Sequence, residues 1–173
     1  MLKHSAGRWV FVSEQALEGF LSEHLEELGL TLLQRQYVAV EDRSDLLAVD
    51  ESGALVILEL KNVEDSGIVA QLTRYYSTVI QERPHSGRVD YSLPVRLIAI
   101  APGFRRQNFV DRKYSRLDFV FLRHSIEENA TGLTLHLTDV DGGQADVLIP
   151  VEGEYARPDP AAEISNRILK GIV

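Results

Sequence analysis

Apolar residues recur at helical spacing near the start of the chain and predict a helix with one buried face. The residues that form this face are Leu17, Phe20, Leu21, Leu25 and Leu28. Ser13 is a suitable N-cap and Gly29 a suitable end, so the helix is expected over residues 13–28. Glu14 lies within about 40° of the centre of the apolar face, at 100° per residue. A carboxylate that points inward needs a partner or a function.

Extended segments and further helices follow in alternation. Extended structure is expected over residues 30–40, 43–50 and 54–61, and the last two are apolar on both faces, as in a strand that is covered on both sides. The later pattern predicts helices over 65–81 and 105–114, strands over 95–101 and 117–122, and a hairpin from 133–137 and 147–149. Strands interleaved with helices, with an antiparallel pair at the centre, predict an α/β fold in which helices flank a mixed central sheet.

The length of 173 residues is typical of one domain, which we place at residues 1–155. Residues 156–173 are expected to form a linker and a C-terminal helix that begins at Asp159-Pro160. Ile164 and Ile168 lie on one face of this helix and could contact a second copy, so a homodimer is one expectation.

Composition excludes several classes of protein. The chain has no cysteine, which excludes disulfides, thiolate zinc sites and iron–sulfur clusters. Eighteen basic and 26 acidic residues give a net charge of −8, so any contact with nucleic acid must come from a local site. The apolar runs are far shorter than the ~20 residues of a membrane helix. The N-terminus has no apolar leader, so we expect a cytoplasmic protein without a membrane partner.

One predicted hairpin brings ionisable residues together. Asp50-Glu51-Ser52-Gly53 suits a three-residue hairpin loop that pairs position 50 with position 54. In that register Asp45 faces Glu59, with their Cβ atoms about 5 Å apart. Lys61 lies two residues further along the strand, and its side chain is on the same face.

Opposed carboxylates repel each other, and a divalent cation between them relieves that repulsion. Mg²⁺ binds one or two carboxylates together with waters and phosphate oxygens, and a neighbouring ammonium can stabilise charge that develops on phosphate. The set therefore indicates phosphodiester hydrolysis. The alternative is that Asp45, Glu59 and Lys61 are solvated charges at a strand end, which form a weak ion pair.

The same residues resemble a known nuclease motif. Ser44-Asp45, a turn, and Glu59-Leu60-Lys61 resemble the PD-(D/E)XK nucleases, with serine in place of the proline. Gln71 to Tyr75 matches the Gln-x-x-x-Tyr helix motif of the RecB-like branch. The run from Asp45 to Lys61 is especially similar to the nuclease domain of NucS-type endonucleases. The resemblance implies a restriction-endonuclease-like fold and a DNA endonuclease that uses Mg²⁺ or Mn²⁺.

The resemblance also implies roles for single residues. Asp45 and Glu59 would bind metal, with the Leu60 carbonyl as a further ligand. Glu14 would bind metal directly or through water, and Glu18 is the second choice for that role. Lys61 would be the catalytic lysine. Gln71 and Tyr75 would position the phosphate or the lysine.

A second candidate surface is basic. Residues 104–116 contain a single acid, Asp111, and aromatic residues that could stack on bases: Phe104, Phe109 and Tyr114. The basic residues are Arg105, Arg106, Arg112, Lys113 and Arg116. They could follow a phosphate backbone, in DNA rather than RNA. The alternative is a solvated helix with aromatic residues in the core.

Two functions from different classes thus follow from the sequence. The first is a metal-dependent deoxyribonuclease with the site named above. The second is a non-catalytic nucleic-acid-binding or assembly module of the same fold, which the negative net charge favours.

Overall fold

The computed structural model describes residues 1–38 and 43–153. The linker and C-terminal helix predicted for residues 156–173 lie outside the described residues, as do Ile164 and Ile168. No helix in the described ranges is long and apolar enough to cross a membrane.

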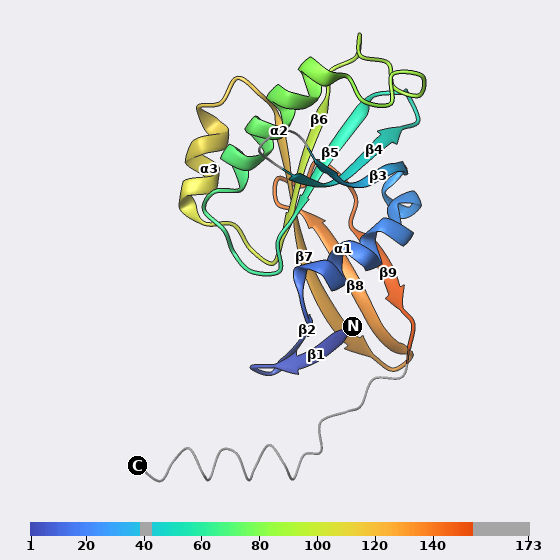
Figure 1. Cartoon of the computed structure of the whole chain (residues 1–173). Helices are drawn as coiled ribbons and strands as arrows, with labels where there is room; N and C mark the ends of the chain where they lie inside the picture. The colour runs from blue at the N-terminus through green and yellow to red at the C-terminus, as the bar shows by residue number, and fades with distance from the viewer. Residues whose placement is uncertain (39–42, 154–173) are drawn as a thin grey trace.

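A single mixed sheet organises the molecule, with helices on both of its faces (Figure 1). The strands are β1 (Leu2–Ser5), β2 (Arg8–Phe11), β3 (Leu30–Val38), β4 (Arg43–Asp50), β5 (Leu55–Leu60), β6 (Arg96–Ala101), β7 (Phe119–Asn129), β8 (Gly132–Asp139) and β9 (Val147–Val151). The helices are α1 (Glu14–Glu23), the 3₁₀ turn η1 (Leu25–Leu28), α2 (Ile68–Glu82) and α3 (Arg106–Lys113). The prediction of a mixed sheet flanked by helices is therefore confirmed.

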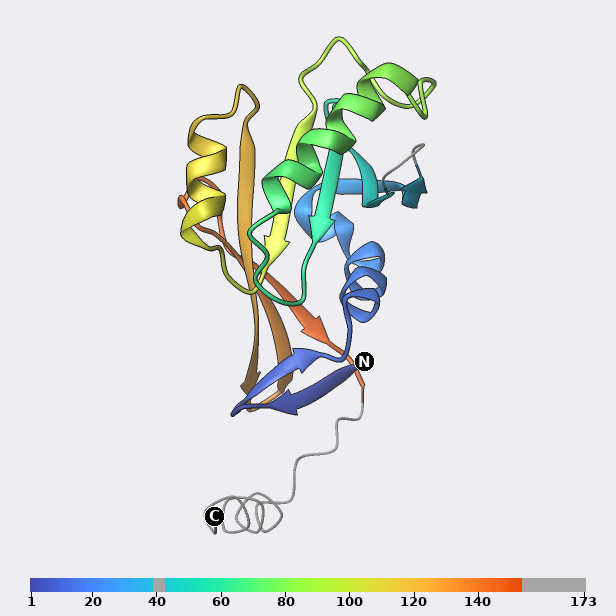
Figure 2. The same ribbon diagram turned by 60° about the vertical axis from the view of Figure 1, so that its left-hand side comes forward.

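The strand order explains the shape of the sheet. The order is β1-β2-β7-β6-β5-β4-β3, and β8 and β9 continue from β7 as a second arm. The parallel pairs are β5 with β6 and β6 with β7, and the connections between them contain α2 and α3. The first part of β7 pairs with β6 and the rest pairs with β8, so the sheet branches and curls at β7 (Figure 2).

Each face of the sheet has its own hydrophobic core. On one face α1 packs against the central strands and against β8 and β9, with Leu17 and Leu21 fully buried among them. On the other face α2 contributes Leu72 and Val79, and the segment that leads into α3 contributes Phe104. Strand β5 is buried along its whole length, as expected for a strand that is covered on both sides.

Several boundaries differ from the sequence predictions, and three of them have a clear physical reason. The first helix ends at Glu23, and the chain continues as the tighter turn η1 to Gly29, whose φ is +71°. Helix α2 begins at Ile68 rather than near residue 65, because the Asp65 side chain accepts a hydrogen bond from the Gly67 N–H and forms a local turn first. Strand β7 continues to Asn129, because its polar second half pairs with β8.

Candidate active site

The β4–β5 hairpin has the predicted register. Leu46 pairs with Leu58 and Leu47 with Ile57, so that Asp45 and Glu59 are the next residues beyond the ladder. The turn is held by Asp50, whose side chain accepts hydrogen bonds from the N–H groups of Ser52 and Ala54. Gly53 has a φ of +91°, which glycine adopts without a steric penalty. The turn therefore fixes which two acids lie side by side.

Both carboxylates of the hairpin are desolvated. Burial and, after it, the negative charge of Asp45 raise the pKa of Glu59 to about 8. Burial also raises the pKa of Asp45 to about 6, against the effect of a 2.7 Å hydrogen bond that its Oδ2 accepts from the Leu60 N–H. A buried acid and a half-buried acid that adjoin favour a positive charge between or beside them.

Lys61 supplies one positive charge. Its Nζ lies 3.2 Å from Glu59 Oε1, 3.9 Å from Glu14 Oε1 and 3.8 Å from Asp65 Oδ2. Burial alone would lower the pKa of Lys61, but the surrounding carboxylates outweigh that effect and raise it. The lysine is therefore an ammonium group at neutral pH.

Helix α1 brings two acids toward this group. The Ser13 side chain accepts a hydrogen bond from the Ala16 N–H, so the helix begins where predicted and carries Glu14 in its first turn. Glu14 is half-exposed and contacts Lys61, whereas Glu18 is buried and bonds to Arg35 and Gln36. Both charges contribute to the raised pKa of Asp45, so both lie near it.

Helix α2 carries the two residues of the Gln-x-x-x-Tyr motif. Gln71 Oε1 is buried and has no hydrogen-bond partner among the described residues. Tyr75 is buried in the core between α2 and the sheet. Leu60, whose carbonyl was proposed as a ligand, is fully buried at the end of β5.

The donor set suits a hard divalent cation. Glu59 Oε2 is buried and has no hydrogen-bond partner within the described part of the chain, so one oxygen of this carboxylate is free to coordinate. In residues 1–38 and 43–153, no group of three or more His, Asp or Glu side chains is arranged to hold a metal ion. The hairpin offers two carboxylates, and Mg²⁺ commonly binds one or two carboxylates together with waters and substrate oxygens.

Three residues near Lys61 were not singled out from the sequence as part of the site. Asp65 contacts the ammonium, and His124 Nε2 donates a 2.9 Å hydrogen bond to the Lys61 carbonyl. Asn108 is fully buried, and its side-chain amide donates to the Asp65 carbonyl at 2.9 Å. Asp65 follows Lys61 by four residues, which was an available signal. The contacts of His124 and Asn108 join residues more than 40 positions apart and have no signal in the sequence.

The basic segment is only partly available for binding. Arg112 forms two hydrogen bonds with Asp141 and lies over the Phe121 ring, and Arg105 lies 3.7 Å from Glu64. The exposed basic residues are Arg105, Arg106, Lys113 and Arg116. Among the aromatic residues, Phe104 stacks on Phe121 in the core, whereas Tyr114 is exposed.

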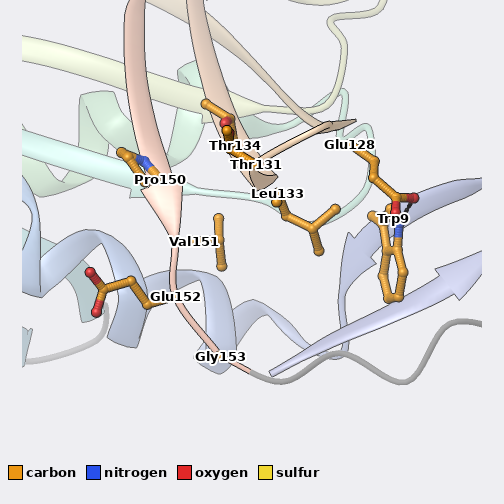
Figure 3. A pocket seen from close by; sticks show the side chains of 10 residues that line it. Trp9, Glu128, Thr131, Leu133, Thr134, Pro150, Val151, Glu152 and Gly153 are labelled. Carbon is orange, nitrogen blue, oxygen red and sulfur yellow. Dashed lines mark hydrogen bonds between the residues drawn. The ribbon is translucent and has the colours of Figure 1, made fainter.

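A separate cavity lies among β2, the β7–β8 hairpin and the end of β9 (Figure 3). Its volume is about 470 Å³, and Trp9, Glu128, Leu133 and Val151 line it. Trp9 Nε1 donates to Glu128 at 3.2 Å on one side of it. None of the candidate active-site residues lines this cavity.

Curated proteins match part of this chain. Endonuclease NucS of Mycobacterium marinum is 42% identical over 64 residues, which cover 36% of this chain and 29% of that protein. Endonuclease NucS of Mycobacterium tuberculosis is 41% identical over 64 residues, with 36% and 28% covered. The matched stretch thus spans less than a third of either relative.

Two solved structures share the fold. A repair endonuclease from Pyrococcus abyssi aligns with a TM-score of 0.50 at 24% identity, over 64% of this chain and 47% of that one. The EndoMS–dsDNA complex aligns with a TM-score of 0.51 at 24% identity, over 64% and 44%. The family model described as the endonuclease NucS C-terminal domain matches residues 13–114, which is more than half of the chain. The chain therefore belongs to the family of the endonuclease NucS C-terminal domain.

Proposed function

We propose that this chain is a metal-dependent nuclease domain that hydrolyses phosphodiester bonds of DNA, with a restriction-endonuclease-like fold and a PD-(D/E)XK site. Membership in the NucS C-terminal family supports the endonuclease class. The single observation that carries the proposal is the desolvated hairpin pair: Asp45 and Glu59 adjoin, Glu59 Oε2 has no hydrogen-bond partner among the described residues, and the Lys61 ammonium lies 3.2 Å from Glu59 Oε1.

Each residue has a role that its environment supports. Asp45 and Glu59 would hold Mg²⁺ or Mn²⁺, with the Leu60 carbonyl and Glu14 as further ligands, Glu14 directly or through water. When bound, the ion would activate water and polarise the phosphate. Lys61 stays protonated because its pKa is raised, so it would stabilise phosphate charge or orient water rather than accept a proton. Gln71 and Tyr75 would orient the phosphate or Lys61 from α2.

The proposed substrate is DNA. The exposed residues Arg105, Arg106, Lys113 and Arg116 would contact phosphates beyond the site, and Arg112 would do so only if it left Asp141. A solved relative, EndoMS, is described in complex with double-stranded DNA. Action of this chain as a homodimer stays a prediction, as does its cytoplasmic location.

Cleavage assays with variants that remove one charge test the proposal. The wild-type chain is expected to cut single-stranded, flap or mismatched DNA in the presence of Mg²⁺ or Mn²⁺. Glu59→Gln and Lys61→Gln should each lower the rate by about 100-fold or more, because each removes a charge that acts on the transition state. Glu51→Gln is the matched control, since Glu51 is an exposed acid of the same hairpin at its opposite end.

The same variants separate the nuclease from the non-catalytic alternative. Titration calorimetry should detect Mn²⁺ binding to wild type and to Glu51→Gln, and lose it in Glu59→Gln. DNA binding without Mn²⁺ binding would favour the non-catalytic module, for which the net charge of −8 is the supporting observation. Cleavage that survives both Glu59→Gln and Lys61→Gln would contradict the nuclease assignment.

A further inference from the structure

A second cluster of polar side chains lies near Asp45. Its centre is Glu18 on α1, which is 3% exposed. Glu18 Oε1 accepts a 3.1 Å hydrogen bond from Arg35 Nε, and Oε2 accepts a 3.1 Å bond from Gln36 Nε2. The Glu18 charge also acts on Asp45, so this cluster and the hairpin acids form one electrostatic group.

The backbone of β3 is distorted where it supplies the two partners. Consecutive residues of a strand normally point to opposite faces, yet Arg35 and Gln36 both reach the same carboxylate. Gln36 has a φ of +52°, a conformation that residues with a side chain rarely adopt. The pairing of β3 with β4 is also irregular just before, between Leu32 and Gln34. Distortions of this kind are found preferentially at functional sites.

Arg35 is held in place but remains open to solvent. Its side chain is 47% exposed, although Glu18 beside it is buried. The bond to Glu18 uses Nε, and one terminal nitrogen lies over Gly19 of α1, about 4.0 Å from where a Cβ would be. A guanidinium group that is oriented by a carboxylate and faces solvent can bind a phosphate through its terminal nitrogens.

Helix α1 relates this arginine to the catalytic group. Glu14 and Glu18 lie one turn apart, about 6 Å along the helix. Glu14 contacts Lys61 at one end, and Glu18 holds Arg35 at the other. Helix α1 therefore links two cations, Lys61 through Glu14 and Arg35 through Glu18, and both of these acids act on Asp45.

We infer that Arg35, oriented by Glu18 and Gln36, binds the phosphate next to the one that is cleaved. The inference rests on the proposed nuclease function, and it adds a substrate-binding subsite to that site. Glu18 and Gln36 are positioning residues in this account. The competing explanation is that Arg35 only neutralises the buried charge of Glu18.

The test measures DNA binding without cleavage. Fluorescence anisotropy with a labelled single-stranded oligonucleotide, in Ca²⁺ instead of Mg²⁺, gives the Kd over a range of salt concentrations. Arg35→Gln should raise the Kd about tenfold. It should also reduce the dependence of log Kd on log salt by about 0.7, the value of one contact with a single strand. Arg88→Gln is the matched control, because Arg88 is exposed in the loop beside the hairpin turn at the far end of β5.

A double variant separates binding from charge neutralisation. Glu18→Gln with Arg35→Gln removes the buried charge together with its partner, so its Tm should exceed that of Arg35→Gln alone. The expected result is a restored Tm with DNA binding still weak.

Recovery of binding together with Tm would overturn the inference, as would an Arg35→Gln variant with the Kd and salt dependence of wild type. If wild type cleaves DNA and the variant binds normally, only this inference fails. If wild type neither binds nor cleaves DNA, the proposed function fails with it.

Discussion

At the scale of single residues, the site is defined by two desolvated carboxylates with one neighbouring ammonium group. Two carboxylates of the hairpin have raised pKa values, and Lys61 is their nearest cation. Burial of acids with too few partners costs free energy, which a divalent cation would return on binding. Under the proposed function, this local cost is the physical basis of the expected metal affinity.

The pH dependence of stability follows from these shifts. Because the pKa of Asp45 rises from 3.8 to about 6 and that of Glu59 from 4.5 to about 8, the folded chain holds protons that the unfolded chain releases. Without divalent cations, the free energy of unfolding contributed by these groups should fall as the pH rises from about 4 to about 8. Chemical denaturation at several pH values should show a steeper fall for wild type than for Glu59→Gln.

His124 also changes the stability of the protein with pH, so the pH dependence of wild type is compared with that of a variant. Burial lowers the pKa of His124, so the stability it contributes is present above about pH 6.5 and is lost as the pH falls. The effect of His124 on stability is opposite in sign to that of the two acids. It is shared by wild type and Glu59→Gln, so the difference between their stabilities reports the contribution of Glu59. Parallel curves for the two proteins would contradict the assigned burial of Glu59.

At the scale of elements, α3 holds the loop that follows Lys61. Asn108 accepts a hydrogen bond from the Arg105 N–H and donates to the Asp65 carbonyl, while Asp65 faces Lys61. On the other side of the same loop, Asn62 donates to the Phe11 carbonyl at 2.9 Å. The loop is thus fixed by two elements that are distant in sequence.

Asn108→Ala should therefore reduce both stability and activity. Loss of the amide leaves the partly buried Asp65 carbonyl and Arg105 N–H without this partner, at a cost of up to about 1–3 kcal/mol each. Urea denaturation should show this loss, and cleavage should slow because Lys61 loses an ordered neighbour. Gln107→Ala is the control, since Gln107 is exposed on the same helix. Equal stability of the two variants would mean that the loop is held by other contacts.

At the scale of the whole molecule, the curled arm contributes to the core around α1. Leu135 of β8 is fully buried there, whereas Leu148 of β9, on a neighbouring strand, is 55% exposed. Strands β8 and β9 therefore contribute side chains to the hydrophobic core around α1.

Leu135→Ala should lower the free energy of unfolding by about 2–5 kcal/mol, because it leaves a cavity in the core. Leu148→Ala should change it by less than about 0.5 kcal/mol. Thermal denaturation of both variants measures the difference. A small effect of Leu135→Ala would show that the arm does not unfold with the rest of the molecule.

Local signals predicted much of this structure, and long-range contacts account for what they missed. The Asp50–Gly53 turn determined the hairpin register, and therefore the approach of Asp45 and Glu59, because a turn type sets its own pairing. Helical periodicity located α1 and α2 to within a few residues. The extension of β7 was not predicted, because its polar second half is stabilised by pairing with β8. The roles of His124 and Asn108 depend on the folded topology alone.

The backbone of Lys61 has a consequence for partly unfolded molecules. Its N–H donates to the Ile100 carbonyl of β6, and its carbonyl accepts from His124 of β7. These contacts lie where β7 passes from β6 to β8. If these strands separate, the lysine loses both anchors at once. Under the proposed function, a molecule that unfolds locally at this junction therefore loses its nuclease activity before the rest of the chain unfolds.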